Sequence, residues 1–199
     1  TLGGDDAASF SISEAGVLTF AAAPNFESKA TYAVTVSVGD GANTTSQALT
    51  VSVTDINEAP VISSSLTLSA AENQTAIGSV VASDAEGADL TFTLAGDDAA
   101  SFSISSAGVL SFAAAPNFEV KSTYSVTVTV SDGTSSNSSD FAITVSNVNE
   151  APIITSAESL SIVENLAEVL TLTSSDPESD SLTYALSGDD AALFSVNAA

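Results

Sequence analysis

Residues 124–145 read YSVTVTVSDGTSSNSSDFAITV and carry the clearest strand pattern in the chain. Large side chains alternate with small polar ones on both sides of an Asp-Gly turn, at Tyr124, Val126, Val128, Val130, Phe141, Ile143 and Val145. In a strand, this alternation places one row of side chains on a buried face and the other row on a solvated face. The stretch therefore predicts two strands joined by a turn.

The same pattern occurs again at a constant offset along the chain. A GDDAA segment begins at Gly4, Gly96 and Gly188, a PNFE segment at Pro24 and Pro116, and an NEAP segment at Asn57 and Asn149. Each copy lies 92 residues after the preceding one. Self-similarity at a fixed spacing is the mark of a repeat architecture, so the sequence predicts a period of 92 residues.

The NEAP segments are the natural boundaries between repeats. Pro60 and Pro152 cannot donate a backbone hydrogen bond to a sheet, and each forces the residue before it into an extended conformation. On this division, residues 1–57 are the C-terminal part of one repeat, 58–149 are a complete repeat, and 150–199 are the N-terminal part of a third. Because both outer parts end within a repeat, we expect the native protein to be longer.

Each repeat is expected to be all-β. Further short apolar runs at Leu66 to Leu68, Leu90 to Leu94 and Phe102 to Phe112 bring the expected total to about seven strands per repeat. That number in a unit of this length predicts an immunoglobulin-like antiparallel sandwich of two sheets. The GDDAA segment is the one place where we expect a helical turn, with an aspartate side chain as its N-cap.

The composition excludes several classes of function. The chain has 25 acidic residues, two lysines and a net charge of −23, so a nucleic-acid partner and direct binding to an anionic membrane are not expected. It has no cysteine and no histidine, which excludes a thiol nucleophile, a Ser-His triad and an ordinary zinc site. No apolar stretch reaches the roughly 18 residues of a membrane span.

The acidic residues are concentrated at the repeat boundaries and in a few loops. They are Asp55, Glu58, Asp84, Glu86, Asp89, Glu150, Asp176, Glu178 and Asp180. Carboxylates held close together repel one another, and this chain has few lysines to offset that repulsion. Calcium takes six to eight oxygen ligands in flexible geometry, whereas magnesium needs a stricter octahedron. The pattern therefore favours calcium, although Asp and Asn in loops are also common turn formers and caps.

One repeat, read from end to end, resembles a bacterial cadherin-type domain. The resemblance rests on the segments FSI at 102–104, GVL at 108–110, APNFE at 115–119, VSDG at 130–133 and VSNVNEAP at 145–152. It extends to all three copies and implies a cadherin-like sandwich with calcium bound between successive repeats.

The resemblance implies ligands on both sides of each boundary, which we call a seam. For the first seam they are Asn25, Glu27, Asp55, Asn57, Glu58, Asp84, Glu86 and Asp132. For the second seam they are Glu72, Asn117, Glu119, Asn147, Asn149, Glu150, Asp176 and Glu178. Glu72 is assigned to the second seam because the first-strand glutamate of the family serves the far end of its own domain.

This chain departs from the family pattern at the linker. The linker DINEAP at 55–60 is one residue shorter than the family motif, and Asn147 replaces its leading aspartate in the second copy. Asn25 and Asn117 stand where the family often has an acid. Fewer negative ligands weaken calcium binding, so we expect a Kd of about 10⁻⁴ to 10⁻³ M. The GDDAA aspartates are expected to form a solvated turn, with Lys29 and Lys121 paired locally to acids.

The leading functional interpretation is a structural or adhesive stalk of an extracellular bacterial surface protein, secreted or attached to the cell. Its expected partners are calcium, neighbouring repeats of the same chain, and other copies in a filament or between cells. A carbohydrate-binding or spacer module of a secreted enzyme is the alternative, although sugar platforms usually need tryptophan or exposed tyrosine. Catalysis by paired carboxylates is a third reading. It would require a polar pocket away from the seams.

Overall fold

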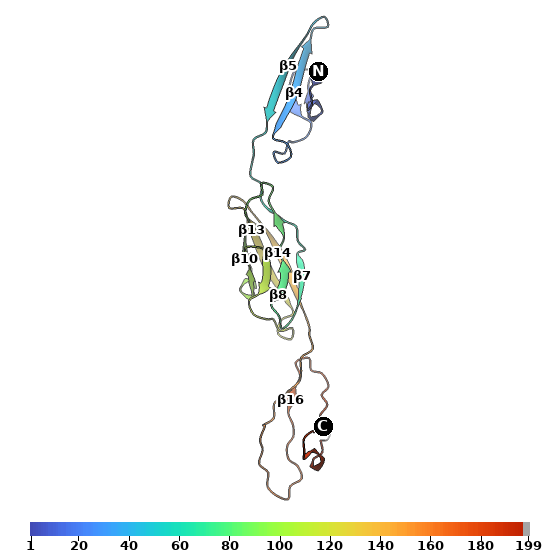
Figure 1. The fold of residues 1–199 in the computed structure, drawn as a ribbon, viewed down its shortest axis with the longest axis vertical. Coiled ribbons are helices and arrows are strands. Elements are labelled where there is room, and N and C mark those ends of the chain that lie inside the picture. The colour runs from blue at the N-terminus through green and yellow to red at the C-terminus, as the bar shows by residue number, and fades with distance from the viewer. Residues whose placement is uncertain (197–199) are drawn as a thin grey trace.

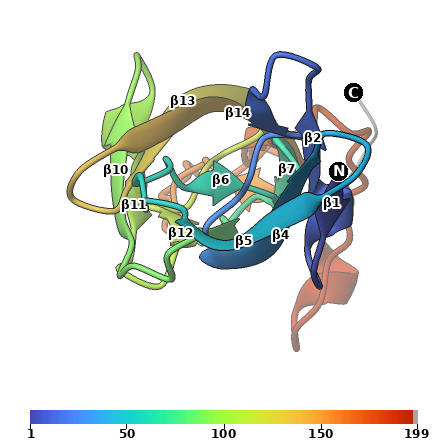
Figure 2. The same ribbon diagram turned by 90° about the horizontal axis from the view of Figure 1, so that it is seen from above.

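The computed structural model describes residues 1–196, which form three units arranged end to end. The N-terminal unit comprises residues 2–52, the central unit residues 61–146 and the C-terminal unit residues 153–193. Figure 1 shows them along one long axis, and they overlap when viewed down that axis in Figure 2. No helix in residues 1–196 has both the length and the hydrophobicity of a membrane span.

The central unit is a sandwich built from two main sheets. One sheet has four strands in the order β10 (Thr91–Ala95), β13 (Thr123–Ser131), β14 (Ser136–Ser146) and β7 (Thr67–Ala71). The other has three strands in the order β11 (Phe102–Ile104), β12 (Val109–Phe112) and β8 (Ala76–Ser79). A short pair, β6 (Val61–Ile62) and β9 (Ala82–Ser83), lies near the start of the unit. The all-β, immunoglobulin-like fold is therefore confirmed.

Residues 124–145, with their alternating apolar and polar side chains, form most of the hairpin β13–β14. The two strands pair antiparallel, with Tyr124 opposite Ile143 and Val126 opposite Phe141. Alternate side chains enter the core, where Val128, Val130 and Ile143 have no exposed surface. The alternation of apolar and polar residues in the sequence therefore corresponds to strands with one buried face and one solvated face. Phe102, Phe112 and Tyr124 extend the core as an aromatic cluster, with the two phenylalanine ring centroids 4.9 Å apart.

One pairing differs from the antiparallel sandwich that the sequence predicts. β7 pairs with β14 in parallel, with Leu68 opposite Ile143 and Ala70 opposite Val145. The first long strand and the last strand of the unit thus run in the same direction. The chain consequently enters the unit at one pole and leaves it at the other, as the end-to-end arrangement in Figure 1 requires.

The N-terminal unit has fewer elements than the central unit. β1 (Leu2–Gly3), β4 (Thr31–Gly39) and β5 (Thr44–Ser52) form one sheet, with β5 at its edge. β2 (Phe10–Ile12) and β3 (Leu18–Phe20) form a second pair. Its core is less covered: Val38 is 71% exposed, whereas Val130, its sequence counterpart in the central unit, is 0% exposed.

The C-terminal unit contains little regular structure. Its strands are β15 (Ile153–Ile154) and β16 (Ser174–Ser175), which pair antiparallel. Residues 159–163, the sequence counterpart of β7, are not in a strand. Leu160, Ile162 and Val163 in this segment are 49%, 52% and 70% exposed. Apolar residues that are expected to be buried in a complete repeat are therefore uncovered here.

Each unit has the single helical turn expected at its GDDAA segment. The turns are η1 (Ala7–Ser9), η2 (Ala99–Ser101) and η3 (Ala191–Leu193), all of the 3-10 type. The expectation that an aspartate side chain caps them is wrong, because Asp6, Asp98 and Asp190 make no side-chain cap bond.

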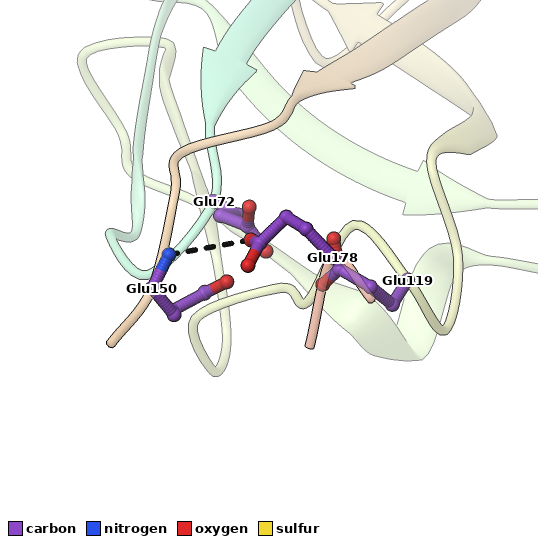
Figure 3. A group of neighbouring side chains, drawn as sticks. All are labelled: Glu72, Glu119, Glu150 and Glu178. Carbon is purple, nitrogen blue, oxygen red and sulfur yellow. Dashed lines mark hydrogen bonds between the residues drawn. The ribbon is translucent and has the colours of Figure 1, made fainter. Parts of the chain in front are cut away.

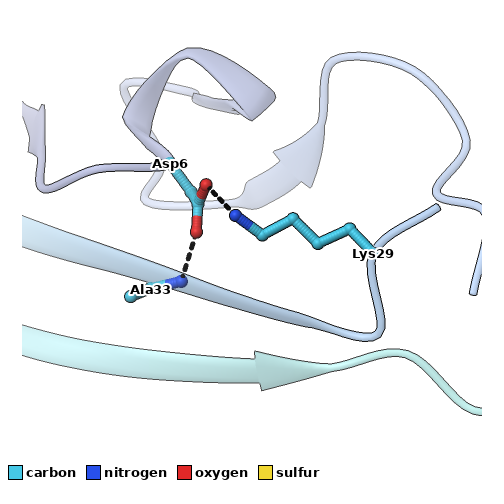
Figure 4. A network of polar contacts seen from close by, with 3 residues as sticks. All are labelled: Asp6, Lys29 and Ala33. Atoms are coloured by element: carbon cyan, nitrogen blue, oxygen red, sulfur yellow. Dashed lines mark hydrogen bonds and ion pairs between the residues drawn. The ribbon is translucent and has the colours of Figure 1, made fainter.

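Two of these aspartates bind elsewhere instead. Asp6 accepts hydrogen bonds from Lys29 and from the backbone N–H of Ala33, as Figure 4 shows, and Asp98 makes the same contacts with Lys121 and Ser125. The lysine bond is the main cause that lowers the pKa of each aspartate, followed by the backbone bond. The expected local pairing of both lysines is thus confirmed.

Candidate metal centre

Four glutamates from two units meet at the second seam (Figure 3). Each of Glu72, Glu119, Glu150 and Glu178 offers one carboxylate oxygen, and these four oxygens lie within 4.8 Å of one another. Glu72 follows β7, Glu119 lies in the loop between β12 and β13, and Glu150 follows β14. Glu178 follows β16 and so reaches the cluster from the C-terminal unit. We call this group the second-seam cluster.

Glu72 is the buried anchor of this cluster. Its side chain is 2% exposed, and its two oxygens accept hydrogen bonds of 2.7 Å each from the backbone N–H groups of Phe118 and Val148. These bonds join the loop before β13 to the linker after β14, which is a structural role in itself. A carboxylate oxygen has a second lone pair, so each remains able to bind a cation.

Glu150 and Glu178 contain oxygens that have no partner in residues 1–196. The Oε2 atoms of both are buried and accept no hydrogen bond. The Glu150 backbone N–H donates to Glu178 Oε1 at 3.3 Å, drawn as the dashed line in Figure 3. A hydrogen bond shared with the Glu150 carboxyl is the main cause that raises the pKa of Glu178. Buried carboxylate oxygens without partners are costly, so this arrangement favours a bound cation.

Three glutamates meet at the first seam. Oxygens of Glu27, Glu58 and Glu86 lie within 4.8 Å of one another, and all three residues are exposed. We call this group the first-seam cluster. A hydrogen bond with Glu86 is the main cause that raises the pKa of Glu58 to about 7, with partial loss of hydration and the charge of Glu27 as further causes. The same bond lowers the pKa of Glu86.

The two clusters use equivalent positions, except for one member. Glu27, Glu58 and Glu86 are the sequence counterparts of Glu119, Glu150 and Glu178. The position equivalent to Glu72 would lie before residue 1, so the two clusters are compared over the three positions that both contain. The first-seam cluster thus has three glutamates, all exposed, whereas the second-seam cluster has four, one of them buried.

Asn57 and Asp132 meet at the first seam without joining its cluster. Asn57 Nδ2 donates to Asp132 Oδ2 at 2.8 Å and to Ser135 Oγ at 3.1 Å. Asp132 Oδ1 accepts the backbone N–H groups of Thr134 and Ser135, and these bonds with that of Asn57 lower its pKa, the Ser135 bond most. The linker is therefore attached to the turn between β13 and β14 of the central unit.

Asp84, Asp55 and Asp176 also lie outside the two clusters. Asp84 Oδ1 accepts the N–H groups of Glu86 and Ala88, while its Oδ2 is buried without a partner. Asp55 contributes to the raised pKa of Glu58, after the larger causes already named. Asp176 Oδ1 accepts the N–H of Asp180 at 3.1 Å.

The other predicted asparagines make hydrogen bonds within turns or to nearby glutamates. Asn25 Oδ1 accepts the N–H of Ser28 at 2.7 Å, and Asn117 Oδ1 accepts that of Val120 at 2.8 Å, so both stabilise turns. The remaining contacts come from Nδ2 atoms: Asn25 to Glu27, Asn147 to Glu119 and Asn149 to the backbone oxygen of Glu150.

Asn73 is a further residue of the second seam that was not predicted from the sequence. Its Nδ2 donates to Glu150 Oε1, and its backbone N–H donates to the oxygen of Pro116 at 3.1 Å. Its φ of 62° is left-handed, a conformation that asparagine tolerates better than most residues. The signal was present, because the Glu72-Asn73 pair recurs as Glu164-Asn165 and Asn165 has a φ of 71°.

One surface hollow, bordered by residues of the central unit, contains none of the glutamates of either cluster. It has a volume of about 530 Å³ and is bordered chiefly by apolar residues, among them Val80, Leu90 and Phe92. Asp89 is the one carboxylate on its border, so this hollow does not offer the carboxylate pair that the catalytic reading requires. Tyr32 and Tyr124 pack edge-on against phenylalanines, and neither forms an open platform for a sugar ring.

Comparison with known proteins assigns the central unit. Residues 57–146 match the family described as a bacterial Ig domain. No curated protein sequence matches the chain at a significant level.

Among solved structures, the chain is similar to human protocadherin-24 EC1-2, with 21% identity, a TM-score of 0.55, and coverage of 74% of this chain and 81% of that one. It is also similar to human CDH23 EC21-23, with 22% identity, a TM-score of 0.58, and coverage of 87% and 62%. At such identities the likeness shows the fold alone. Together with the family match, it supports a bacterial immunoglobulin-like repeat with the fold of a cadherin domain at residues 57–146.

Proposed function

We propose that this chain is a structural or adhesive segment of an extracellular surface protein, stiffened by calcium bound at the seams between its repeats. The observation that carries the proposal is the second-seam cluster. Glu72 and Glu119 come from the central unit, Glu150 comes from the linker that follows it, and Glu178 comes from the C-terminal unit. An ion held by all four would join two units that are otherwise connected by one extended linker.

The charge balance supports a cation at this place. The only side-chain cations in the chain are Lys29 and Lys121, and both are bound to aspartates near the 3-10 turns. Neither takes part in the second-seam cluster. The buried Oε2 atoms of Glu150 and Glu178 therefore need a positive charge from solution or a bound proton.

The donor chemistry favours calcium among the cations. The cluster offers only oxygen ligands. Asp176 and the backbone carbonyls of the linker are close to its members in sequence and would supply further oxygen ligands. Zinc sites usually include sulfur or nitrogen ligands, and the chain has neither cysteine nor histidine. Calcium accepts six to eight oxygens at 2.3–2.6 Å in irregular geometry, which suits four glutamates from separate loops.

The residues that would hold the ion differ in how firmly the protein orients their carboxylates. Glu72 would act as the fixed ligand, because two backbone bonds already orient its carboxylate. Glu119 is exposed and its carboxylate contact with Asn147 is long, at 3.4 Å, so it would be oriented by the ion. At the first seam, Glu27, Glu58 and Glu86 would supply the equivalent ligands, and the position equivalent to Glu72 would lie before residue 1.

Bound calcium would stabilise the folded array by mass action. A ligand that binds only the native state contributes about 2.7 kcal/mol when its concentration is 100 times its Kd. Bacterial Ig domains and cadherin-like domains are typically extracellular, non-enzymatic modules, and this is the setting in which millimolar calcium could occupy weak sites. Neighbouring repeats of a tandem array with a 92-residue period would then be the main partners of each unit.

Isothermal titration calorimetry on the calcium-free chain tests this function. We expect calcium to bind with a Kd of about 10⁻⁴ to 10⁻³ M. Glu119→Gln should weaken the second-seam site by about tenfold, because it removes one charged ligand. Glu14→Gln is the matched control, since Glu14 is exposed and lies outside both clusters.

The proposal fails if the wild-type chain takes up no calcium in this range. It fails equally if the Glu119 and Glu14 variants lose the same affinity, because the seam acids would then act as diffuse surface charge.

A further inference from the structure

Asparagine side chains contact three of the seam glutamates. The amide groups donate hydrogen bonds from Asn25 to Glu27 at 2.8 Å, from Asn147 to Glu119 at 3.4 Å, and from Asn73 to Glu150. An amide N–H orients a carboxylate but carries no charge of its own. The negative charge of the glutamates therefore stays available to a cation.

Carboxylates outside the clusters are held differently. Lys29 binds Asp6, as Figure 4 shows, and Lys121 binds Asp98. A lysine neutralises the carboxylate that it orients, and neither aspartate belongs to a glutamate cluster. Among the described residues, charged donors thus hold these two aspartates, whereas neutral donors hold glutamates at the seams.

Asn73 is the most firmly placed of the three asparagines. It follows Glu72 at the end of β7, and its backbone N–H donates to the oxygen of Pro116 at 3.1 Å. The N–H of Glu72 donates to the oxygen of Ser146 at 3.1 Å, and two further backbone N–H groups hold its carboxylate. The backbone that carries the Asn73 amide is therefore fixed to the loop before β13 and to the end of β14.

The contact with Asn73 leaves Glu150 with one oxygen in use and one free. Its Oε1 accepts the Asn73 amide, while its Oε2 is buried and has no partner in residues 1–196. The backbone N–H of Glu150 donates to Glu178 Oε1 at 3.3 Å (Figure 3). Asn73 is thus connected through Glu150 to the C-terminal unit.

We propose that Asn73 is a positioning residue of the second-seam site, whose amide holds Glu150 Oε1 so that Oε2 is presented to the bound calcium. This inference rests on the proposed calcium function. It assigns Asn73 no bond to the ion, because the residue acts through Glu150. Outer partners that orient metal ligands typically contribute 10- to 100-fold to metal affinity.

A glycine variant separates the amide from the turn. Asn73 has a φ of 62°, a conformation that glycine adopts without strain and alanine does not. Asn73→Gly therefore removes the amide and keeps the backbone. Asn165→Gly is the matched control, since Asn165 has a φ of 71° and lies outside both clusters.

Nuclear magnetic resonance of the full chain in chelator tests the contact itself. An amide that donates to an ionised carboxylate makes a strong hydrogen bond. One proton of the Asn73 side-chain amide should therefore resonate downfield of an exposed amide. Glu150→Ala should return it to the ordinary position. An Asn73 amide with the same shift in both proteins would overturn the proposal.

A calcium titration by the same method tests the consequence. The backbone amide signals of each cluster report calcium binding at its own seam, so the first seam is an internal reference. Asn73→Gly should raise the Kd at the second seam by about tenfold and leave the first seam unchanged. Asn165→Gly should change neither. In the Glu150→Ala background, Asn73→Gly should cause no further loss, because no side chain remains to be oriented.

The outcomes separate this inference from the function on which it rests. If the wild-type chain shows no calcium-dependent shift at either seam, the proposed function fails and the inference fails with it. If wild type and Asn73→Gly bind calcium equally, only the positioning role is wrong. A tenfold loss that persists in the Glu150→Ala background would also overturn that role. A lower melting temperature in chelator with unchanged calcium affinity would show that Asn73 serves the turn alone.

Discussion

The central unit and the N-terminal unit share much of their sequence, and they differ in how much of it is buried. Leu110 is 0% exposed, whereas its counterpart Leu18 is half-buried. The alternating strand pattern is therefore enough to specify the hairpins but not a buried core. A buried core also needs the first strands of the repeat, which in the central unit close over the hairpin.

The largest effect expected from this comparison is in the core. Leu110→Ala should lower the free energy of unfolding by about 3 kcal/mol, because it removes buried methyl groups and leaves a cavity. Leu18→Ala should cost much less, since its side chain retains contact with solvent. Urea denaturation of both variants measures this, and equal losses would show that the two units are packed alike.

Variants of Glu72 and Glu119 distinguish structural support of the loops from ion binding. Glu72→Ala leaves the N–H groups of Phe118 and Val148 without their acceptor, and it should cost about 2 kcal/mol even in chelator. Glu119→Gln should leave the stability in chelator unchanged and remove part of the stabilisation by calcium. Thermal melts with and without calcium distinguish the two. A Glu72→Ala variant that melts like wild type in chelator would contradict the anchoring role.

A glycine occupies the equivalent turn position in the central unit and in the N-terminal unit. Gly108 and Gly16 have φ values of 76° and 82°, so a side chain is strained at either position. A Cβ at Gly108 would also lie 2.4 Å from the backbone oxygen of Val80, whereas nothing lies within 4 Å at Gly16.

We therefore expect Gly108→Ala to cost about 2 kcal/mol and Gly16→Ala about 1 kcal/mol. Their urea midpoints measure this difference. The packing of the turn against Val80 would be refuted if both midpoints fell by the same amount.

The smallest effect should come from Asp98. Because its pKa is lowered in the folded chain by Lys121 and by the Ser125 N–H, its ionised form stabilises the fold above the ordinary pKa of an aspartate. That contribution is lost as the pH falls through the lowered pKa. Asp98→Asn should therefore reduce stability at pH 7 and flatten its decline below about pH 4. Melting temperatures between pH 2 and 7 test this, and an unchanged slope would contradict it.

Much of the fold follows from local patterns. The alternation around the Asp132-Gly133 turn predicts the β13–β14 hairpin, and the apolar positions that it names are buried in the central unit. The parallel pairing of β7 with β14 was not predicted. A strand's own pattern shows which of its faces is buried, but its direction relative to a distant strand depends on how the whole chain is connected.

The candidate site was predicted in outline. Seven of the sixteen residues assigned through the family resemblance meet in the two glutamate clusters. All seven are glutamates, whose longer side chains reach across a seam, while Asn25 and Asn117 are bound within their own turns. Asn73 was missed because its role depends on a left-handed backbone conformation that composition does not reveal.

The central claim is that calcium at the seams makes the chain a stiff rod. Small-angle X-ray scattering of the 199-residue chain, at concentrations where it is monomeric, tests this most directly. In millimolar calcium, the account predicts a narrow distance distribution with a maximum dimension set by three units in line. In chelator, the distribution should shorten and broaden as the linkers at 55–60 and 147–152 become hinges, while each unit keeps its own fold. Identical scattering curves in calcium and in chelator would contradict the account.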